Sequence, residues 1–256
     1  MKAIVLTYDR YVKVLDHTLH TYQNLWPSNP FTFRVPYQVY PHFLKEKYGD
    51  KIELVASPKQ IKPTVEKLLE DLPDSEWVYW CIDDKYLLEI KEKKVTDIYH
   101  WVKNIQDPKI GSVMFSRSRN LLKRQNLNYN KTIRGPENTV FIQRWNYAQI
   151  WLHQFVRVKV LKTLFAGFPD RDFAAKEMDR LKREQKVPRN QELYVAKKNM
   201  VIFGESTSRG QLTKNCVESF QKWGLEVPSN LERSDREIII GKLPPKIFGI
   251  EVPFLN

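Results

Sequence analysis

Hydrophobic positions in the first 90 residues switch between short continuous runs and the spacing of an amphipathic helix. The continuous runs predict buried strands at residues 3–8, 31–36, 52–56 and 77–82. Helical spacing predicts a helix over residues 11–26, ended by Pro27, and a second helix that begins near Pro63. This alternation predicts an α/β fold with a doubly wound, mainly parallel central sheet flanked by helices.

Beyond residue 90 the pattern is less regular. Strand-like runs recur at residues 110–115, 139–143 and 200–203. Helical spacing predicts a helix capped by Thr96, a long helix over 146–165, a helix from Asp170 or Asp172 to about 185, and a helix over 212–223 that ends at Gly224. Residues 116–137 are polar and basic without periodicity, which predicts a long loop. Residues 228–256 hold four prolines and predict an irregular tail wrapped on a single domain of residues 1–256.

The net charge indicates which kind of partner to expect, and the cysteine content indicates which cellular compartment. The 256 residues carry 42 Lys and Arg against 30 Asp and Glu, a net charge of +12 that favours anionic partners. The charge is scattered, so nucleic acid is a less favoured partner than a phosphorylated ligand. Cys81 and Cys216 lie in apolar surroundings and are expected to be reduced. With no signal peptide or transmembrane run expected, we predict a cytoplasmic protein, with peripheral binding to the inner membrane surface left open.

Two adjacent carboxylates, Asp83 and Asp84, follow the apolar run at residues 77–82. Ligands of open α/β sheets bind at the carboxyl ends of the strands, and paired acids there can hold a divalent cation that in turn holds a phosphate. The polar segment 7–10, Thr-Tyr-Asp-Arg, ends the first strand at the same edge. Neither a Gly-x-Gly-x-x-Gly nor a P-loop motif occurs, which argues against dinucleotide-binding and P-loop proteins. The alternative is that both aspartates are solvated turn residues.

In these features the first 115 residues or so resemble nucleotide-sugar glycosyltransferases of the Rossmann-like GT-A fold. The resemblance implies a nucleotide-binding half at residues 1–115 and a partly helical acceptor-side half at 116–227. It implies that the acidic motif, usually Asp-any-Asp, holds Mn²⁺ or Mg²⁺ on the diphosphate of a nucleotide sugar, UDP-linked by preference. For the metal it implies Asp84 as the favoured direct ligand, with Asp83 on the ribose or behind the metal, and a later ligand that is Glu205, an oxygen of Ser206 or Asn215, or water. For the nucleoside it implies Thr7, Tyr8, Asp9, Arg10 and Asp83.

Glycosyl transfer also needs groups that stabilise the leaving diphosphate and, in an inverting enzyme, a general base. Arg209 and Lys214, after the late strand, are candidates for the diphosphate. Asp170 and Asp172, in the acceptor-side half, are candidates for the base. For each pair the simpler interpretation stays open: solvated charge for the first and helix capping for the second.

Three other functions remain open. A sugar-phosphate nucleotidyltransferase is disfavoured because no glycine-rich basic loop follows the first strand. A nucleic-acid or anionic-surface binder without catalysis has the basic stretch 117–134 in its favour. A transferase that binds nucleotide but has lost transfer is the third. If the chain is a glycosyltransferase, the same stretch 117–134 is expected to form a mobile loop over the donor that orders when nucleotide binds.

Overall fold

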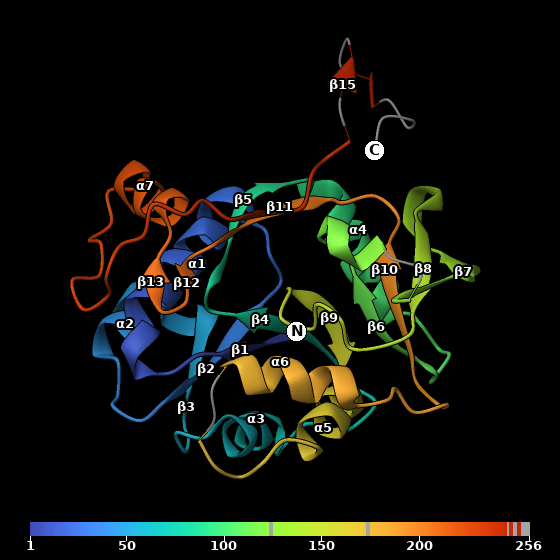
Figure 1. Ribbon diagram of the computed structural model, residues 1–256, viewed down its shortest axis with the longest axis horizontal. Coiled ribbons are helices and arrows are strands. Elements are labelled where there is room, and N and C mark those ends of the chain that lie inside the picture. Colours follow the sequence, from blue (N-terminus) through green and yellow to red (C-terminus); the bar gives the residue numbers. More distant parts are fainter. Residues whose placement is uncertain (123–124, 173–174, 245, 248–249, 252–256) are drawn as a thin grey trace.

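The computed structural model describes residues 1–122, 125–172, 175–244, 246–247 and 250–251. A sheet of nine strands runs through this part of the chain in the order β3-β2-β1-β4-β9-β6-β10-β8-β7 (Figure 1). Its strands are β1 (Lys2–Leu6), β2 (Thr32–Tyr37), β3 (Ile52–Ala56), β4 (Trp77–Ile82), β6 (Ile110–Met114), β7 (Leu127–Arg134), β8 (Val140–Arg144), β9 (Gln154–Arg157) and β10 (Glu192–Ala196).

Strands β3, β2, β1 and β4 are parallel neighbours, and their pairing aligns the carboxyl ends of β1 and β4 at Leu6 and Ile82. β9 lies antiparallel between β4 and β6, and β8 lies antiparallel between β10 and β7. Within this sheet the other strands therefore run in one direction. The predicted α/β fold class, with a mainly parallel central sheet, is confirmed.

Helices cover both faces of the sheet because its strands are apolar on both sides. On β1, Ala3 and Val5 face one core and Ile4 faces the other. The first core receives α1 (Val12–Leu25) and α4 (Glu92–Lys103), and the second receives α3 (Ile61–Leu69) and α5 (Val158–Ala166). Helix α6 (Ala175–Glu184) packs on this second core through Met178 and Leu181, beside α3 and α5 (Figure 1).

A second, smaller sheet carries the part of the site that lies outside the nine strands. β5 (Lys85–Ile90) follows β4 after two residues, and it pairs antiparallel with β11 (Val201–Glu205), which in turn pairs with β14 (Ile239–Ile240). The hairpin β12 (Thr207–Ser208) and β13 (Gln211–Leu212) leads to α7 (Lys214–Lys222). Shorter elements are α2 (His42–Tyr48), β15 (Lys246–Ile247), β16 (Ile250–Glu251) and the 3-10 turns Asp9–Tyr11, Gly49–Lys51, Arg119–Leu122 and Pro136–Asn138.

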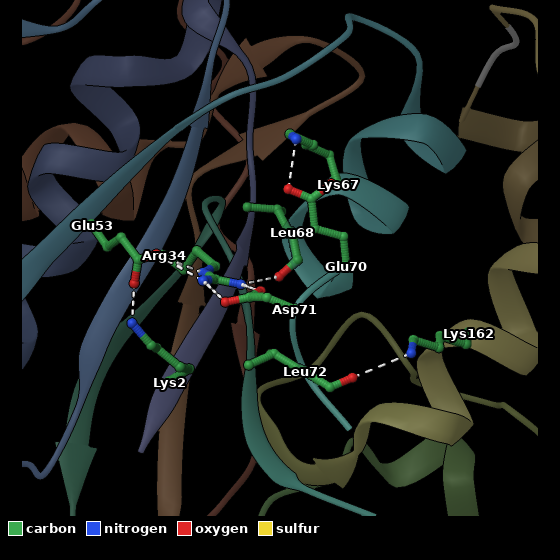
Figure 2. Close-up of polar contacts among 9 residues, drawn as sticks. All are labelled: Lys2, Arg34, Glu53, Lys67, Leu68, Glu70, Asp71, Leu72 and Lys162. Carbon is green, nitrogen blue, oxygen red and sulfur yellow. Dashed lines mark hydrogen bonds and ion pairs between the residues drawn. The ribbon is translucent and has the colours of Figure 1, made fainter. Parts of the chain in front are cut away.

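Arg34, a buried cation on β2, ties the end of α3 to the sheet (Figure 2). Its guanidinium donates to the Leu68 carbonyl oxygen at 2.8 Å and to Asp71 Oδ2 at 2.8 Å. It also donates to Glu53 Oε1 on β3 at 2.7 Å. A buried charge is tolerated only when it is paired and hydrogen-bonded, and these contacts meet that requirement. These hydrogen bonds hold β2, β3 and the end of α3 together in the part of the sheet that leads to the carboxyl ends of β1 and β4.

The structure corrects several sequence-based predictions. The long helix over 146–165 is wrong: residues 154–157 form the buried strand β9, and helix begins only at Val158. β9 has only four residues, all buried, with Phe155 in one core and Val156 in the other, so it shows no alternation that would separate it from a buried helix. Strands β5 and β10 were missed, and Thr96 lies inside α4 rather than at its cap.

The basic stretch is also more regular than predicted, since residues 127–134 form the edge strand β7, paired with β8. Lys123, Arg124 and parts of the predicted tail (245, 248–249 and 252–256) lie outside the described residues. In the described part of the chain, no helix is both long and apolar enough to cross a membrane.

Candidate functional site

Asp83 and Asp84 form the two-residue connection between β4 and β5, where the carboxyl ends of β1 and β4 meet. The backbone N–H of Asp83 donates to the Leu6 carbonyl oxygen at 3.2 Å. Thr7 Oγ1 donates to Asp83 Oδ2 at 2.6 Å, and Thr18 Oγ1, from α1, donates to the Asp83 carbonyl oxygen at 2.6 Å. The predicted end of the first strand and the predicted acidic pair are therefore in direct contact.

Burial sets the protonation of Asp83. Its side chain is 8% exposed. Burial, with a second contribution from the negative charge of Asp84, raises the pKa of Asp83 to about 7, although the hydrogen bond from Thr7 acts in the opposite direction. The carboxyl group therefore changes charge near neutral pH.

Lys85 lies between two of the carboxylates predicted to bind metal. Its Nζ is 2.7 Å from Asp84 Oδ1 and 3.1 Å from Glu205 Oε1. Lys85 and Glu205 are direct partners in the β5–β11 ladder, so the backbone register itself brings them together. Burial disfavours the ammonium, but attraction to Asp84 and Glu205 outweighs burial and raises the pKa of Lys85. These three residues are called the Lys85 cluster below.

The other residues after β1 have distinct surroundings. Asp9 accepts backbone N–H bonds from Gln38 at 3.0 Å and from Val39 at 2.8 Å, so it fixes the loop that follows β2. Tyr8 is 36% exposed and lies edge-on to Tyr11. Arg10 is exposed as well. Two side chains of this segment thus face solvent at the edge where Thr7 meets Asp83.

The segment after β11 is anchored to the acidic turn. The Ser206 N–H donates to the Asp84 carbonyl oxygen at 2.7 Å, and Thr213 caps α7 through its side chain. Arg209 is exposed at the tip of the β12–β13 hairpin with a positive φ of 55°. Lys214, the first residue of α7, is exposed and lies 3.9 Å from Glu218. Glu205 reaches the cluster, whereas Arg209 and Lys214 point to no partner in the turn.

A cavity of about 680 Å³ lies along α6. It is lined by α6 and by two loops, with Asp179, Lys182, Arg183, Asn146, Gln149, Leu121, Gln125, Asn126 and Ala148 in its wall. No residue of the Lys85 cluster is a wall residue, but Asp179 is near enough to Glu205, and Lys182 near enough to Lys85, for their charges to interact. Asp179 accepts hydrogen bonds from Trp151 Nε1 at 3.1 Å and pairs with Lys182 at 2.5 Å.

Arg144, 2% exposed, adds positive charge beneath this cavity. It donates to the carbonyl oxygen of Ala148, a wall residue, at 3.0 Å, and to Gln154 Oε1 at 2.8 Å. Within the described residues no carboxylate pairs with it. Burial lowers the pKa of Arg144 to about 9, which still leaves it mostly protonated at neutral pH. An uncompensated cation below the wall favours an anionic occupant.

The candidates for the general base lie away from this cavity wall. Asp170 pairs with Lys62 at 3.1 Å and Asp172 pairs with Lys59 at 3.9 Å, and both carboxylates are mostly exposed. Neither is a wall residue of the cavity. Their catalytic role stays a prediction.

As they are placed here, Asp83, Asp84 and Glu205 do not fit a divalent ion. Asp83 is held by Thr7, and the ammonium of Lys85 lies between the other two. Among the residues that the structure describes, no group of three or more His, Cys, Asp or Glu side chains gathers in a way that could hold a metal ion.

Comparisons with known proteins returned structural similarity only. Neither the protein-family models nor the curated proteins gave a match. The chain is similar to 2-C-methyl-D-erythritol 4-phosphate cytidylyltransferase (IspD) of Francisella tularensis, with 17% identity, TM-score 0.43, and 88% and 99% of the two chains covered. It is similar to an active-site mutant of LgtC, with 10% identity, TM-score 0.42, and 90% and 98% covered. It is also similar to TarS (residues 1–349) of S. aureus, with 15% identity, TM-score 0.45, and 78% and 59% covered. At these scores the likeness assigns no reaction.

Sequence reasoning missed Lys85, Asp179, Lys182 and Arg144. For Lys85 a signal was available, because a lysine directly after two acids at a strand end is a ready counter-ion. Asp179 and Lys182 lie on the polar face of a charged helix, and only the fold shows that this face borders a cavity.

Proposed function

We propose that the chain is a glycosyltransferase that moves a sugar from a nucleotide-diphosphate donor, UDP-linked by preference, to a hydroxyl group of an acceptor. The observation that carries this proposal is the contact between Thr7 and Asp83. It lies between β1 and β4, where the chain order reverses from one side of the sheet to the other. Open α/β sheets bind nucleotides at such a switch point.

In this proposal the nucleoside lies along the ends of β1 and β4. Tyr8 is exposed enough to stack on the base, and Asp83 accepts a hydrogen bond from a ribose hydroxyl. The diphosphate extends toward the cavity, where Lys182 and Arg183 form part of the wall. Arg209 and Lys214 stay candidates for the diphosphate, since both residues are exposed in the segment that is anchored to the acidic turn.

The acceptor occupies the cavity. Its hydroxyl oxygen attacks the anomeric carbon, the bond from that carbon to the diphosphate oxygen breaks, and the electron pair leaves with the diphosphate. In an inverting reaction the hydroxyl proton passes to a carboxylate. Asp179 is the preferred base because it lines the cavity. Burial opposes the charge of Asp179, but Lys182 outweighs it and lowers the pKa, so the carboxylate is ionised at neutral pH. Asp170 and Asp172 are the alternatives.

Calorimetric titration tests the donor site. UDP is titrated into wild type, Asp83→Asn and Asp50→Asn, with GDP and CTP as competing nucleotides. At pH 8, where the carboxyl group of Asp83 is ionised, we expect UDP to bind wild type and Asp83→Asn to weaken binding about tenfold, as expected for one lost hydrogen bond to a charged group. Asp50 is a fully exposed acid outside the site and serves as the matched control.

The same titrations separate the rival functions. Tighter binding of CTP than of UDP, with release of pyrophosphate when a sugar phosphate is added, would assign a nucleotidyltransferase. Absence of binding by every nucleotide, together with salt-dependent binding of RNA or DNA, would replace the proposal by an anionic-polymer binder.

A further inference from the structure

The Lys85 cluster already contains a cation. Asp84 and Glu205 would supply oxygen ligands to a divalent ion, and the same oxygen atoms lie 2.7 Å and 3.1 Å from Lys85 Nζ. Mn²⁺ and Mg²⁺ need direct oxygen contacts at close to 2.1 Å. The ammonium and a metal ion would therefore compete for one place.

Lys85 is fixed in that place by the backbone. It is the first residue of β5, directly after Asp84, and its partner in the ladder is Glu205. The Asp84 carbonyl oxygen is held by the Ser206 N–H, next to Glu205. The side chain of Lys85 is only 7% exposed, so its ammonium group cannot turn outward into solvent. A cation held in this way needs no reorganisation when an anion arrives.

The charges around the cluster also disfavour a metal. The ammonium offsets one of the two negative charges of Asp84 and Glu205, and Asp83 is hydrogen-bonded to Thr7 instead of reaching toward them. An added divalent ion would lie against the ammonium of Lys85. Of the three N–H bonds of an ammonium, two are used by Asp84 and Glu205, which leaves one for a phosphate oxygen.

We propose that Lys85 is the built-in cation of the donor site, and that this protein binds its nucleotide diphosphate without a divalent metal ion. The inference rests on the proposed function for the identity of the ligand. Lys85 contacts the diphosphate from the β5 side through the N–H bond that Asp84 and Glu205 leave unused.

Two measurements test this inference. In the first, Mn²⁺ alone is titrated into the full chain and free Mn²⁺ is followed by electron paramagnetic resonance. Wild type and the control Lys67→Ala, which removes an exposed lysine paired with Glu70, are expected to leave Mn²⁺ free. Lys85→Ala is expected to gain one saturable site, because Asp84 and Glu205 lose their counter-ion, and Lys85→Ala with Glu205→Gln is expected to lose that site again. A saturable site in wild type that Glu205→Gln removes would overturn the inference.

In the second measurement, UDP is titrated into wild type in EDTA and in Mn²⁺. Equal dissociation constants are expected, and affinity at least tenfold higher in Mn²⁺ would overturn the inference. If UDP binds in neither condition, the proposed function fails, while the Mn²⁺ titration still decides whether the cluster takes a metal. Neither decisive result uses Lys85→Ala, so both stand even if that variant does not fold.

Discussion

Lys85 and Glu205 face each other across the antiparallel strands β5 and β11, with Nζ 3.1 Å from Oε1. The pair lies next to the turn that holds Asp83 and Asp84. The pairing of β5 with β11 therefore places one cation and one carboxylate at the candidate site. Glu205 is about 120 residues from Lys85 in the sequence, and this pairing is a property of the fold rather than of a local motif.

We predict strong coupling between Lys85 and Glu205 in a double-mutant cycle. Lys85→Met leaves Asp84 and Glu205 without a partner and is expected to cost about 3 kcal/mol of the free energy of unfolding. Glu205→Gln alone is expected to cost less, because Asp84 still pairs with Lys85. Lys85→Met with Glu205→Gln is expected to recover at least about 1 kcal/mol relative to the sum of the single changes. Urea denaturation of the four proteins measures this, and simple additivity would contradict a direct pair.

A second prediction concerns pH and Asp83. The folded protein holds a proton on Asp83 up to about pH 7, whereas the unfolded chain releases it near its ordinary pKa of 3.8. Between these values the folded state binds more protons, so the contribution of Asp83 to stability falls as the pH rises through this window. Asp83→Asn cannot ionise. We expect its stability relative to wild type to be greater at pH 8 than at pH 4 by on the order of 2–4 kcal/mol.

The measurement is urea denaturation of wild type and Asp83→Asn at pH 4, 6 and 8. Asp50→Asn is the control, because that carboxylate is fully exposed and is expected to show no difference of this kind. A difference between wild type and Asp83→Asn that is constant with pH would mean that Asp83 ionises normally in the folded protein.

The sequence predicted those parts of the fold that follow from the local periodicity of hydrophobic residues. Strands β1 to β4 and helices α1 and α3 follow from runs and spacings within residues 3–82, and Gly224, with a φ of 65°, ends the last helix as expected. β9 could not be predicted in this way. Its four residues include the polar Gln154 and Arg157 and show no alternation of apolar and polar side chains, so only its insertion between β4 and β6 shows that it is a strand.

The candidate site also has a part that the sequence predicts and a part that depends on long-range packing. Asp83 and the segment 7–10 each follow a predicted strand, so their meeting at one edge follows from parallel topology. The partners of Lys85 and the cavity beside α6 depend on long-range packing of segments with no periodic signal of their own. Asp179 is an example. In the sequence it is one of many charged residues on a polar helix, and only the structure shows that Trp151 and Lys182 hold it at the cavity wall.

Arg34 supports a third prediction, on the stability of the nucleotide-binding edge. Arg34→Met leaves Glu53 and Asp71 without the guanidinium that bridges β2, β3 and α3, and is expected to lower the free energy of unfolding by about 3 kcal/mol. Lys67→Ala, which removes an exposed i,i+3 pair from the same helix, is expected to change it by less than about 0.5 kcal/mol. Equal effects in urea denaturation would show that the network in Figure 2 does not hold α3 on the sheet.

A fourth prediction concerns the loops beside the cavity. Leu121, Gln125 and Asn126 line it, whereas β7 is paired with β8. We therefore expect UDP or an acceptor to slow tryptic cleavage within residues 117–126 and to leave cleavage at Lys131 and Arg134 unchanged. Equal protection of both segments would restore the expectation of one mobile loop over the whole of 117–134.

The identity of the general base is the last prediction. Asp179 lines the cavity, whereas Asp170 and Asp172 pair with Lys62 and Lys59 outside it. If the reaction inverts configuration, Asp179→Asn is expected to lower the rate of transfer by about 10²- to 10⁴-fold while UDP affinity stays within about threefold of wild type, because a general base acts on the acceptor proton and not on the nucleotide.

Asp170→Asn and Asp172→Asn are the matched controls and are expected to transfer at rates close to wild type. A large loss in either control with full activity in Asp179→Asn would return the role to the residues predicted from the sequence. Unchanged transfer in all three, with retained sugar configuration in the product, would show that the chemistry needs no protein base.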